Sequence, residues 1–208
     1  MKRNLIAVAV GCVLVAALAL PAQAADIVDE WTNVKAPAAP TLKEVKVDPK
    51  TTALLMLDFM NQNCGKRPRC IATLPAMKKL LDAARAAKMP VVYSLIANTT
   101  AADVMKEVAP QAGEPSVLSG PDKFRNTDLE KILRDKGITT VIVAGTAANG
   151  AVLQTAIGAA LRGMNVIAPV DGLSSVEAYA DLSTVYTFAS APSLSAKTTL
   201  TRSGMIKF

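Results

Sequence analysis

Continuous apolar runs recur along the chain, each followed by a polar or glycine-containing stretch. Residues 51–58 (TTALLMLD) contain one run that ends in Asp58, residues 90–96 (PVVYSLI) contain a second, and residues 139–145 (TTVIVAG) contain a third. Uninterrupted apolar runs of this kind are typical of parallel strands whose two faces are both buried. Further strands are predicted at 165–172 and at 197–201.

Between these runs, apolar residues recur at helical spacing. The segment 73–88 places Leu74, Met77, Leu81 and Ala84 on one face of a helix. The other predicted helices cover residues 126–137, 149–163 and 176–189. Alternating strands and helices predict right-handed crossovers and a mostly parallel sheet of about six strands between two helix layers. We therefore expect an α/β three-layer sandwich with Rossmann-like topology.

The first residues have the pattern of an export signal. Lys2 and Arg3 precede an apolar stretch, and residues 22–24 (AQA) have the small-x-small pattern after which signal peptidase cleaves. We expect residues 1–24 to be a cleaved signal peptide, so that no stable membrane anchor remains and the protein is periplasmic or secreted. The alternative is a retained anchor, for which the apolar stretch is short.

The predicted domain follows an extended arm. Residues 25–50 are rich in Ala and Pro and show no apolar periodicity, so we expect an N-terminal arm there. Residues 51–208 are expected to form one domain. The carboxyl ends of its parallel strands define the edge at which a ligand site is expected.

Two cysteines remain once the signal peptide is removed. Cys64 and Cys70 flank a short basic loop, and an even pair in an exported protein predicts a disulfide. Free thiols or a redox role are the alternatives. Zinc is not expected, because the spacing does not fit and the chain has no histidine.

Composition and motifs argue against nucleic acid as a partner and against a nucleotide cofactor. The chain has 23 Lys and Arg against 17 Asp and Glu, a formal net charge of +6, with 4% aromatic residues and no basic stripe. Nucleic acid is therefore not an expected partner. Gly145 and Gly150 have the spacing of a phosphate loop, but Ala151 and Val152 replace its Lys-Ser/Thr, so neither a nucleotide nor another cofactor is expected.

Three stretches together resemble a known family. LLMLDFMNQNC at 54–64, the segment 124–140, and VIVAGTAANGAVLQTA at 141–156 resemble, in this order, the isochorismatase-like hydrolases, also called the cysteine hydrolase superfamily. The resemblance covers about residues 51–208. It implies a parallel sheet between helices, homo-oligomers, and a non-proline cis peptide near Thr146-Ala147.

The resemblance also implies a catalytic Asp, Lys and Cys, in which the Asp takes the proton of the thiol that attacks an amide. Asp58 matches the Asp at the end of the first strand. Counting through the motifs places the Lys position at Leu118 and the Cys position at Ala151. Lys123 is a nearby candidate for a shifted lysine, although a lysine at a helix start is commonly a surface residue. On this count Asp58 has no lysine partner.

The same alignment predicts a small apolar pocket beside Asp58. Its expected lining residues are Leu118, Phe124, Thr146, Ala147, Ala148, Asn149 and Ala151. A small-molecule ligand is the partner that such a pocket implies.

Three functional hypotheses follow. The first is an exported pseudoenzyme with a ligand-binding or assembly role, because two of the three catalytic positions are apolar. The second is a thiol-independent hydrolase that uses Asp58 as general acid or base. Isochorismatases, which resemble this chain, also carry a small residue at the Cys position. Isochorismate itself is a cytoplasmic compound, which argues against it as the substrate of an exported protein. The third is a redox role for Cys64 and Cys70.

Overall fold

A computed structural model describes residues 24–208 of the protein. The chain divides into two compact units, Met1–Ala38 and Ala39–Phe208. The larger unit holds the sheet and all the elements of the predicted ligand site. The predicted signal-peptide segment lies almost entirely outside the described residues and stays a prediction.

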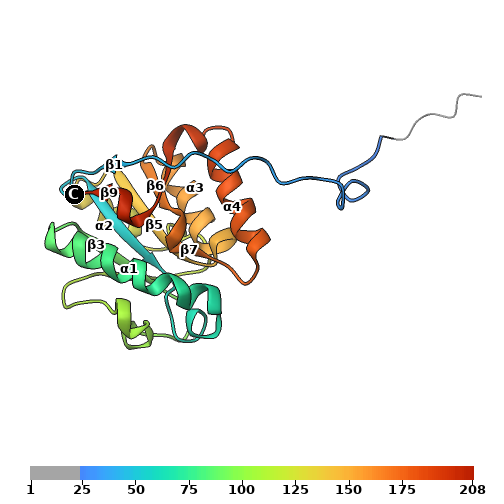
Figure 1. Ribbon diagram of the computed structural model, residues 1–208. Helices are drawn as coiled ribbons and strands as arrows, with labels where there is room; N and C mark the ends of the chain where they lie inside the picture. The colour runs from blue at the N-terminus through green and yellow to red at the C-terminus, as the bar shows by residue number, and fades with distance from the viewer. Residues whose placement is uncertain (1–23) are drawn as a thin grey trace, which may run out of the picture. The chain divides into compact units, whose positions relative to one another are not determined.

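The larger unit is built on a parallel sheet (Figure 1). Its strand order is β4-β3-β2-β5-β6-β8, and a short β7 also pairs with β5, so the sheet has seven strands where about six were expected. The strands are β2 (Thr52–Leu57), β3 (Val91–Leu95), β4 (Ser116–Leu118), β5 (Thr140–Thr146), β6 (Asn165–Pro169), β7 (Leu173–Ser174) and β8 (Thr198–Thr201). Every pairing in this sheet is parallel, which confirms the predicted fold class.

Helices cover both faces of the sheet. They are α1 (Pro68–Ala86), α2 (Leu129–Asp135), α3 (Leu153–Leu161) and α4 (Ala178–Ser190). The 3-10 helices are η1 (Cys64–Lys66), η2 (Ala101–Asp103), η3 (Lys106–Val108), η5 (Val170–Gly172), η6 (Ser195–Lys197) and η7 (Ser203–Met205), while η4 (Ala148–Val152) is a π-helical turn.

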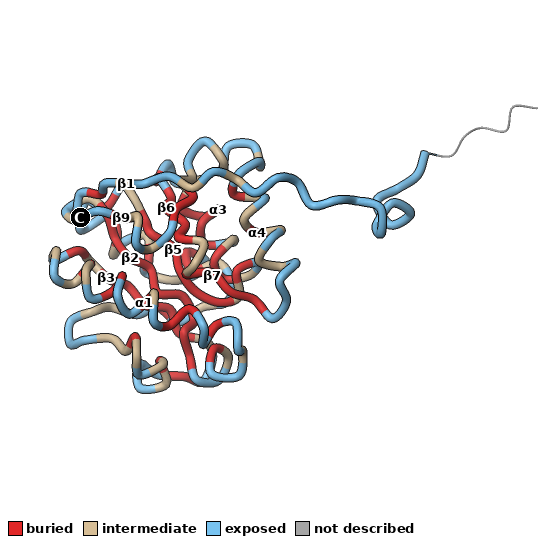
Figure 2. The backbone as a smooth tube through the Cα atoms, in the orientation of Figure 1, coloured by how far each residue is buried: buried red, intermediate tan, exposed pale blue. Residues whose placement is uncertain are grey.

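The central strand β2 shows how the three layers form. Leu54 and Met56 pack into the core beside the apolar face of α1, whereas Leu55 and Leu57 point to the other face and pack with residues of α2, α3 and α4. Successive side chains of a strand point to opposite faces, so a continuous apolar run fills both cores at once. Figure 2 shows the buried residues concentrated along these central strands.

The folded unit begins earlier than the sequence predicted. Val45–Lys46 form β1, which pairs in parallel with β9 (Ile206–Lys207), and Val47 is buried. The expected arm of residues 25–50 therefore extends too far, because a two-residue strand gives no detectable periodicity. The compact unit starts at Ala39.

Residues 24–38 form a separate, mostly exposed segment. Asp26 Oδ1 accepts hydrogen bonds from the backbone N–H groups of Val28 and Asp29, which organises a local turn. Within residues 24–208, no helix combines the length and the apolar character needed to cross a membrane.

Candidate functional site

Asp58 lies at the carboxyl end of β2, at the predicted edge of the sheet. Its backbone is left-handed, with φ of 56°, so the chain turns sharply where the strand ends. Ser94 on β3 holds it from both sides: the Asp58 backbone N–H donates to Ser94 Oγ (3.1 Å), and Ser94 Oγ donates to Asp58 Oδ1 (2.6 Å). The carboxylate is thereby fixed in a buried position.

Lys123 pairs with this carboxylate. Its side chain is 1% exposed, and Nζ lies 2.8 Å from each of the two carboxylate oxygens of Asp58. Nζ also donates to the carbonyl oxygen of Gly120 at 2.9 Å. The expectation that Asp58 has no lysine partner is therefore wrong. Leu118, the position at which the lysine was counted, is 55% exposed at the end of β4.

The loop between β4 and α2 holds Lys123 in place. Thr155 on α3 accepts a hydrogen bond from the Lys123 backbone N–H at 3.3 Å, and Thr127 Oγ1 donates to the Lys123 carbonyl oxygen. Phe124 is buried beside Gly158, and the Arg162 guanidinium lies 4.4 Å from its ring centroid. Anchored on the helix layer in this way, the loop directs the neighbouring lysine back toward the sheet.

The second side of the site is the turn after β5. The Thr146–Ala147 peptide is cis, where the family resemblance placed it. Gly145 precedes it, and a Cβ there would lie 2.2 Å from the carbonyl oxygen of Leu57, so only glycine allows β5 to approach the end of β2 this closely. The turn continues into α3 past Ala151, which is 4% exposed and was expected from the family resemblance to stand at the Cys position.

A cavity of about 530 Å³ lies between these two sides. It is lined by Asp58, Asn63, Arg67, Ile96, Ala97, Leu118, Ser119, Gly120, Pro121, Lys123, Thr146, Ala147, Gly150 and Ala151. Asp58 and four of the predicted lining residues are among them: Leu118, Thr146, Ala147 and Ala151.

Three predicted lining residues do not reach this cavity. Phe124 is in the core, and the Ala148 backbone N–H, itself buried, donates to Ser175 Oγ at 3.0 Å. Asn149 is exposed and accepts from Ser175 Oγ at 3.3 Å. All three lie next to true lining residues in sequence, and the irregular backbone of both segments turns their side chains away.

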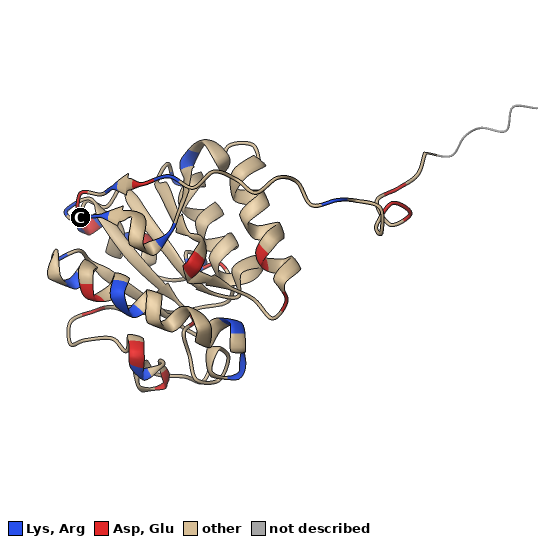
Figure 3. Cartoon of the chain, in the orientation of Figure 1, with Lys and Arg blue, Asp and Glu red and all other residues tan. Residues whose placement is uncertain are grey.

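The disulfide predicted from sequence is present. Cys64 and Cys70 are bonded, with their Cα atoms 5.2 Å apart. We use the term disulfide loop for residues 64–70. The basic residues of this loop lie at the start of α1, where Figure 3 shows the backbone coloured blue. Arg67, in the middle of the loop, lines the cavity and donates from Nη1 to Thr146 Oγ1 at 3.0 Å.

A neighbouring loop supports the segment between Asp58 and the disulfide loop. Asp103 accepts from the Thr100 backbone N–H (2.8 Å) and from Gln62 Nε2 (2.7 Å), and its carbonyl accepts from the Asn61 backbone N–H. Hydrogen bonds from Thr100 and then from Gln62 lower the pKa of the Asp103 carboxyl, because they stabilise its charged form.

A separate buried polar cluster lies away from the cavity. Arg85 donates to both carboxylate oxygens of Glu114 and to Tyr93 Oη, and Tyr93 donates to the carbonyl oxygen of Val108. Burial raises the pKa of the Tyr93 hydroxyl, so it stays a neutral donor. None of these four residues lines the cavity, so the cluster is structural.

The cis peptide lies where the family resemblance placed it, and comparison with known proteins identifies the family. The isochorismatase domain matches residues 52–187. The chain belongs to the isochorismatase domain family. The structure pairs Asp58 with Lys123 in this chain.

A secreted relative is known. The chain is 30% identical over 113 residues to the secreted isochorismatase effector Isc1 of Verticillium dahliae. The match covers 49% of this chain and 60% of the length of that protein.

Solved structures have the same fold. A cysteine hydrolase from Pseudomonas syringae pv. phaseolicola 1448A superposes with a TM-score of 0.68 at 22% identity, covering 79% of this chain and 94% of the other. An N-carbamoylsarcosine amidase from Thermoplasma acidophilum superposes with a TM-score of 0.64 at 23% identity, covering 74% and 96%.

The arrangement is suited to proton transfer rather than to covalent catalysis. Asp58 can accept a proton and Lys123 can donate one, and both line the cavity. No thiol or hydroxyl nucleophile stands at position 151. Among residues 24–208 no cluster of three or more His, Cys, Asp or Glu side chains could hold a metal ion.

Proposed function

We propose that this protein is a thiol-independent hydrolase of a small molecule, and specifically that it splits a vinyl ether of the isochorismate class. The observation that supports this proposal is the buried contact of 2.8 Å between Lys123 Nζ and the Asp58 carboxylate beside a cavity that lacks the family nucleophile. A vinyl ether needs a proton donor and water, but no thioester. Ala151 is compatible with that chemistry.

In the proposed reaction, water supplies all the atoms that the products gain. Its oxygen becomes the carbonyl oxygen of one product, one of its hydrogens goes to the former alkene carbon, and the other goes to the departing alcohol. Asp58 takes a proton from water, and Lys123 Nζ returns a proton to the substrate. Ser94, which donates to Asp58 Oδ1, orients the carboxylate.

Export supports an extracellular or periplasmic site of action. The predicted signal peptide and the secreted relative from Verticillium dahliae both favour it. The name of that relative also answers the objection from location, because a secreted isochorismatase exists within the matched family. We propose the same compartment for this protein.

The test is a hydrolysis assay of the purified protein on 2-phenoxyacrylate (phenoxyacrylate below), a carboxylated vinyl ether, with an aryl amide and an aryl ester beside it. We expect release of phenol and pyruvate from phenoxyacrylate. The Asp58→Asn and Lys123→Met variants should each lose about 10²- to 10⁴-fold in rate, the usual contribution of a positioned acid or base.

A matched control variant shows whether the loss of any partly buried ion pair lowers the rate, or only the loss of the pair in the cavity. Glu114→Gln removes the carboxylate of the Arg85–Glu114 pair, which lies outside the cavity, and should leave the rate unchanged. Absence of turnover of every substrate, in a protein whose circular dichroism is that of a folded domain, would refute the hydrolase proposal. It would favour the pseudoenzyme alternative, a binding or assembly protein, for which Ala151 is the supporting residue.

Self-association is a second part of the proposal. The resemblance to this family implies a homo-oligomer, and Leu182 and Tyr186 on α4 are exposed apolar residues that could contribute to a contact. Multi-angle light scattering should give at least twice the mass of the mature chain. A monomer at all concentrations used in the hydrolysis assay would refute this part.

A further inference from the structure

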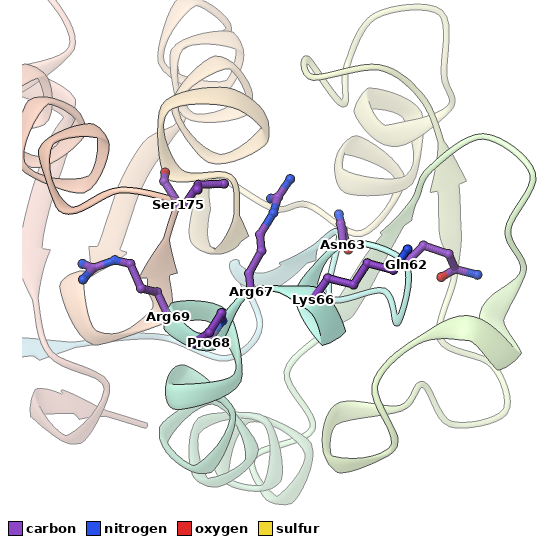
Figure 4. A pocket seen from close by; sticks show the side chains of 8 residues that line it. Gln62, Asn63, Lys66, Arg67, Pro68, Arg69 and Ser175 are labelled. Carbon is purple, nitrogen blue, oxygen red and sulfur yellow. The ribbon is translucent and has the colours of Figure 1, made fainter.

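Arg67 stands where two cavities meet. It lines the cavity that contains Asp58 and Lys123, and it also lines a second cavity of about 320 Å³ beside the disulfide loop. Figure 4 shows the Arg67 side chain extending from the start of α1 between Ser175 and Asn63, while Arg69 points to the other side. No other charged side chain lines both cavities.

The guanidinium of Arg67 has no acidic partner within residues 24–208. Its one hydrogen bond there is the donation from Nη1 to Thr146 Oγ1 at 3.0 Å, which leaves most of its N–H groups available. Lys123 pairs with Asp58, and Arg69 pairs with Asp181 at 2.5 Å. Lys66, which lines only the smaller cavity, is exposed. Among the charged residues that line the larger cavity, Arg67 therefore supplies the excess positive charge.

The disulfide loop fixes the backbone that carries this side chain. The Arg67 backbone N–H donates to the carbonyl oxygen of Cys64 (3.0 Å), and the Cys70 backbone N–H donates to the carbonyl oxygen of Arg67 (2.9 Å). The disulfide joins the same two cysteines. Arg67 is thus held from both sides before any ligand binds, which reduces the entropy lost on binding.

We propose that Arg67 is a specificity-determining residue that binds the carboxylate of a small anionic ligand in the larger cavity, and that the disulfide loop positions it for this role. A guanidinium presents paired N–H donors that match the two oxygens of a carboxylate. At the cavity mouth it would orient an anionic ligand with its uncharged part toward Asp58, Lys123 and the turn at Ala147. The role of Arg67 in substrate recognition rests on the proposed function. The binding of an anionic ligand by Arg67 can be measured without any hydrolysis.

The test uses two saturated ethers that this chemistry cannot hydrolyse. Phenoxyacetate carries a carboxylate, and phenoxyethanol is its uncharged counterpart. Isothermal titration calorimetry of the full protein should show tighter binding of phenoxyacetate. Arg67→Gln should weaken phenoxyacetate binding by about 10- to 100-fold, as expected for loss of a charge-assisted hydrogen bond, and should leave phenoxyethanol binding unchanged.

Two further variants make the result specific. Arg67→Lys keeps the charge without the paired donors and should recover only part of the lost affinity. Arg202→Gln removes one positive charge from an exposed site outside both cavities and should bind phenoxyacetate as the wild type does. Equal weakening by Arg202→Gln would mean that net charge alone attracts the anion, and it would overturn the proposal.

The outcomes also separate this inference from the proposed function. If phenoxyacetate binding depends on Arg67 but phenoxyacrylate is not hydrolysed, the inference stands and the hydrolase proposal fails. If phenoxyacrylate is hydrolysed and Arg67→Gln changes neither its KM nor phenoxyacetate binding, the inference is overturned. Failure of the wild type to prefer the anion, including no binding of either probe, overturns it as well.

Discussion

The two sides of the cavity differ in what they retain. One side, from Asp58 through the disulfide loop, is charged and tied by an ion pair, a covalent bond and side-chain hydrogen bonds. The other side, from Gly145 to Ala151, has a cis peptide and a close approach of backbones, but its side chains are small and mostly apolar. The groups that we propose for proton transfer and anion binding are charged side chains, whereas the second side contributes mainly the shape of its backbone.

The largest effect should come from breaking the charged side at its centre. Lys123→Met leaves the Asp58 carboxylate buried without its counter-ion, and it should lower the free energy of unfolding by about 3–5 kcal/mol. Urea denaturation followed by circular dichroism measures this change. Adding Asp58→Asn should recover much of the loss, because no buried charge then remains. A single Lys123→Met variant as stable as the wild type would contradict the buried pair.

The next effect concerns the covalent tie on the same side. The Cys64→Ser, Cys70→Ser double variant should lower the free energy of unfolding by about 2 kcal/mol, the chain-entropy value for a loop this short. Reduction of the wild type with dithiothreitol should give a similar decrease. If the free energy of unfolding does not decrease, the hydrogen bonds of the disulfide loop hold it without the covalent bond. The two sides of the cavity then differ less in how firmly they are held.

A thiol can be returned to the apolar side. Ala151→Cys should change stability by no more than about 1.5 kcal/mol, because the position borders the cavity. With Lys123 in the same cavity to stabilise a thiolate, iodoacetamide should label this variant about tenfold faster than Ala156→Cys, whose site is buried in α3. Mass spectrometry measures both labelling rates, after the labelling of the wild-type protein is subtracted. Equal rates would mean that the turn no longer presents position 151 to the cavity.

The smallest effect is a pH dependence at Asp103. Folding lowers the pKa of the Asp103 carboxyl. The charged carboxylate therefore stabilises the folded state above the pKa of the unfolded chain, and this stabilisation is lost as the pH falls through the pKa of the folded state. Asp103→Asn should therefore narrow the difference in urea midpoint between about pH 6 and about pH 3. Because the side chain is exposed, the change should be small. An unchanged pH profile would show that Asp103 does not support the charged side.

The sequence predicted the layers and one half of the site, for reasons that particular residues make clear. Asp58 was found because a buried strand has to end in a polar turn at the ligand edge of the sheet. Ala151 was expected to line the cavity because the motif after β5 places it in the turn, and it does so. Both inferences depend on local patterns, which a single sequence contains in full.

Lys123 and Arg67 could not be placed from the sequence alone, because their positions depend on loops. The count that led to Leu118 assumed a fixed loop length before α2, and in this chain the lysine enters the cavity five residues later, held by Phe124 in the core. Arg67 belongs to the short basic loop that the two cysteines flank. Its position between two cysteines was the available signal, since a disulfide holds a short loop rigid.

The parallel pairing of β1 with β9 places the last strand of the chain beside the first strand of the folded unit. Because the two strands are parallel, Phe208 lies near Val47, and a flexible linker that closes the chain has to run back along residues 39–47 to reach Ala39. New termini opened between Lys136 and Gly137, both exposed, would give a circular permutant in which the order of strands along the gene changes but their order in space does not. In such a protein the segment that bears Arg67 and the segment that bears Ala151 would be joined through the former ends of the chain.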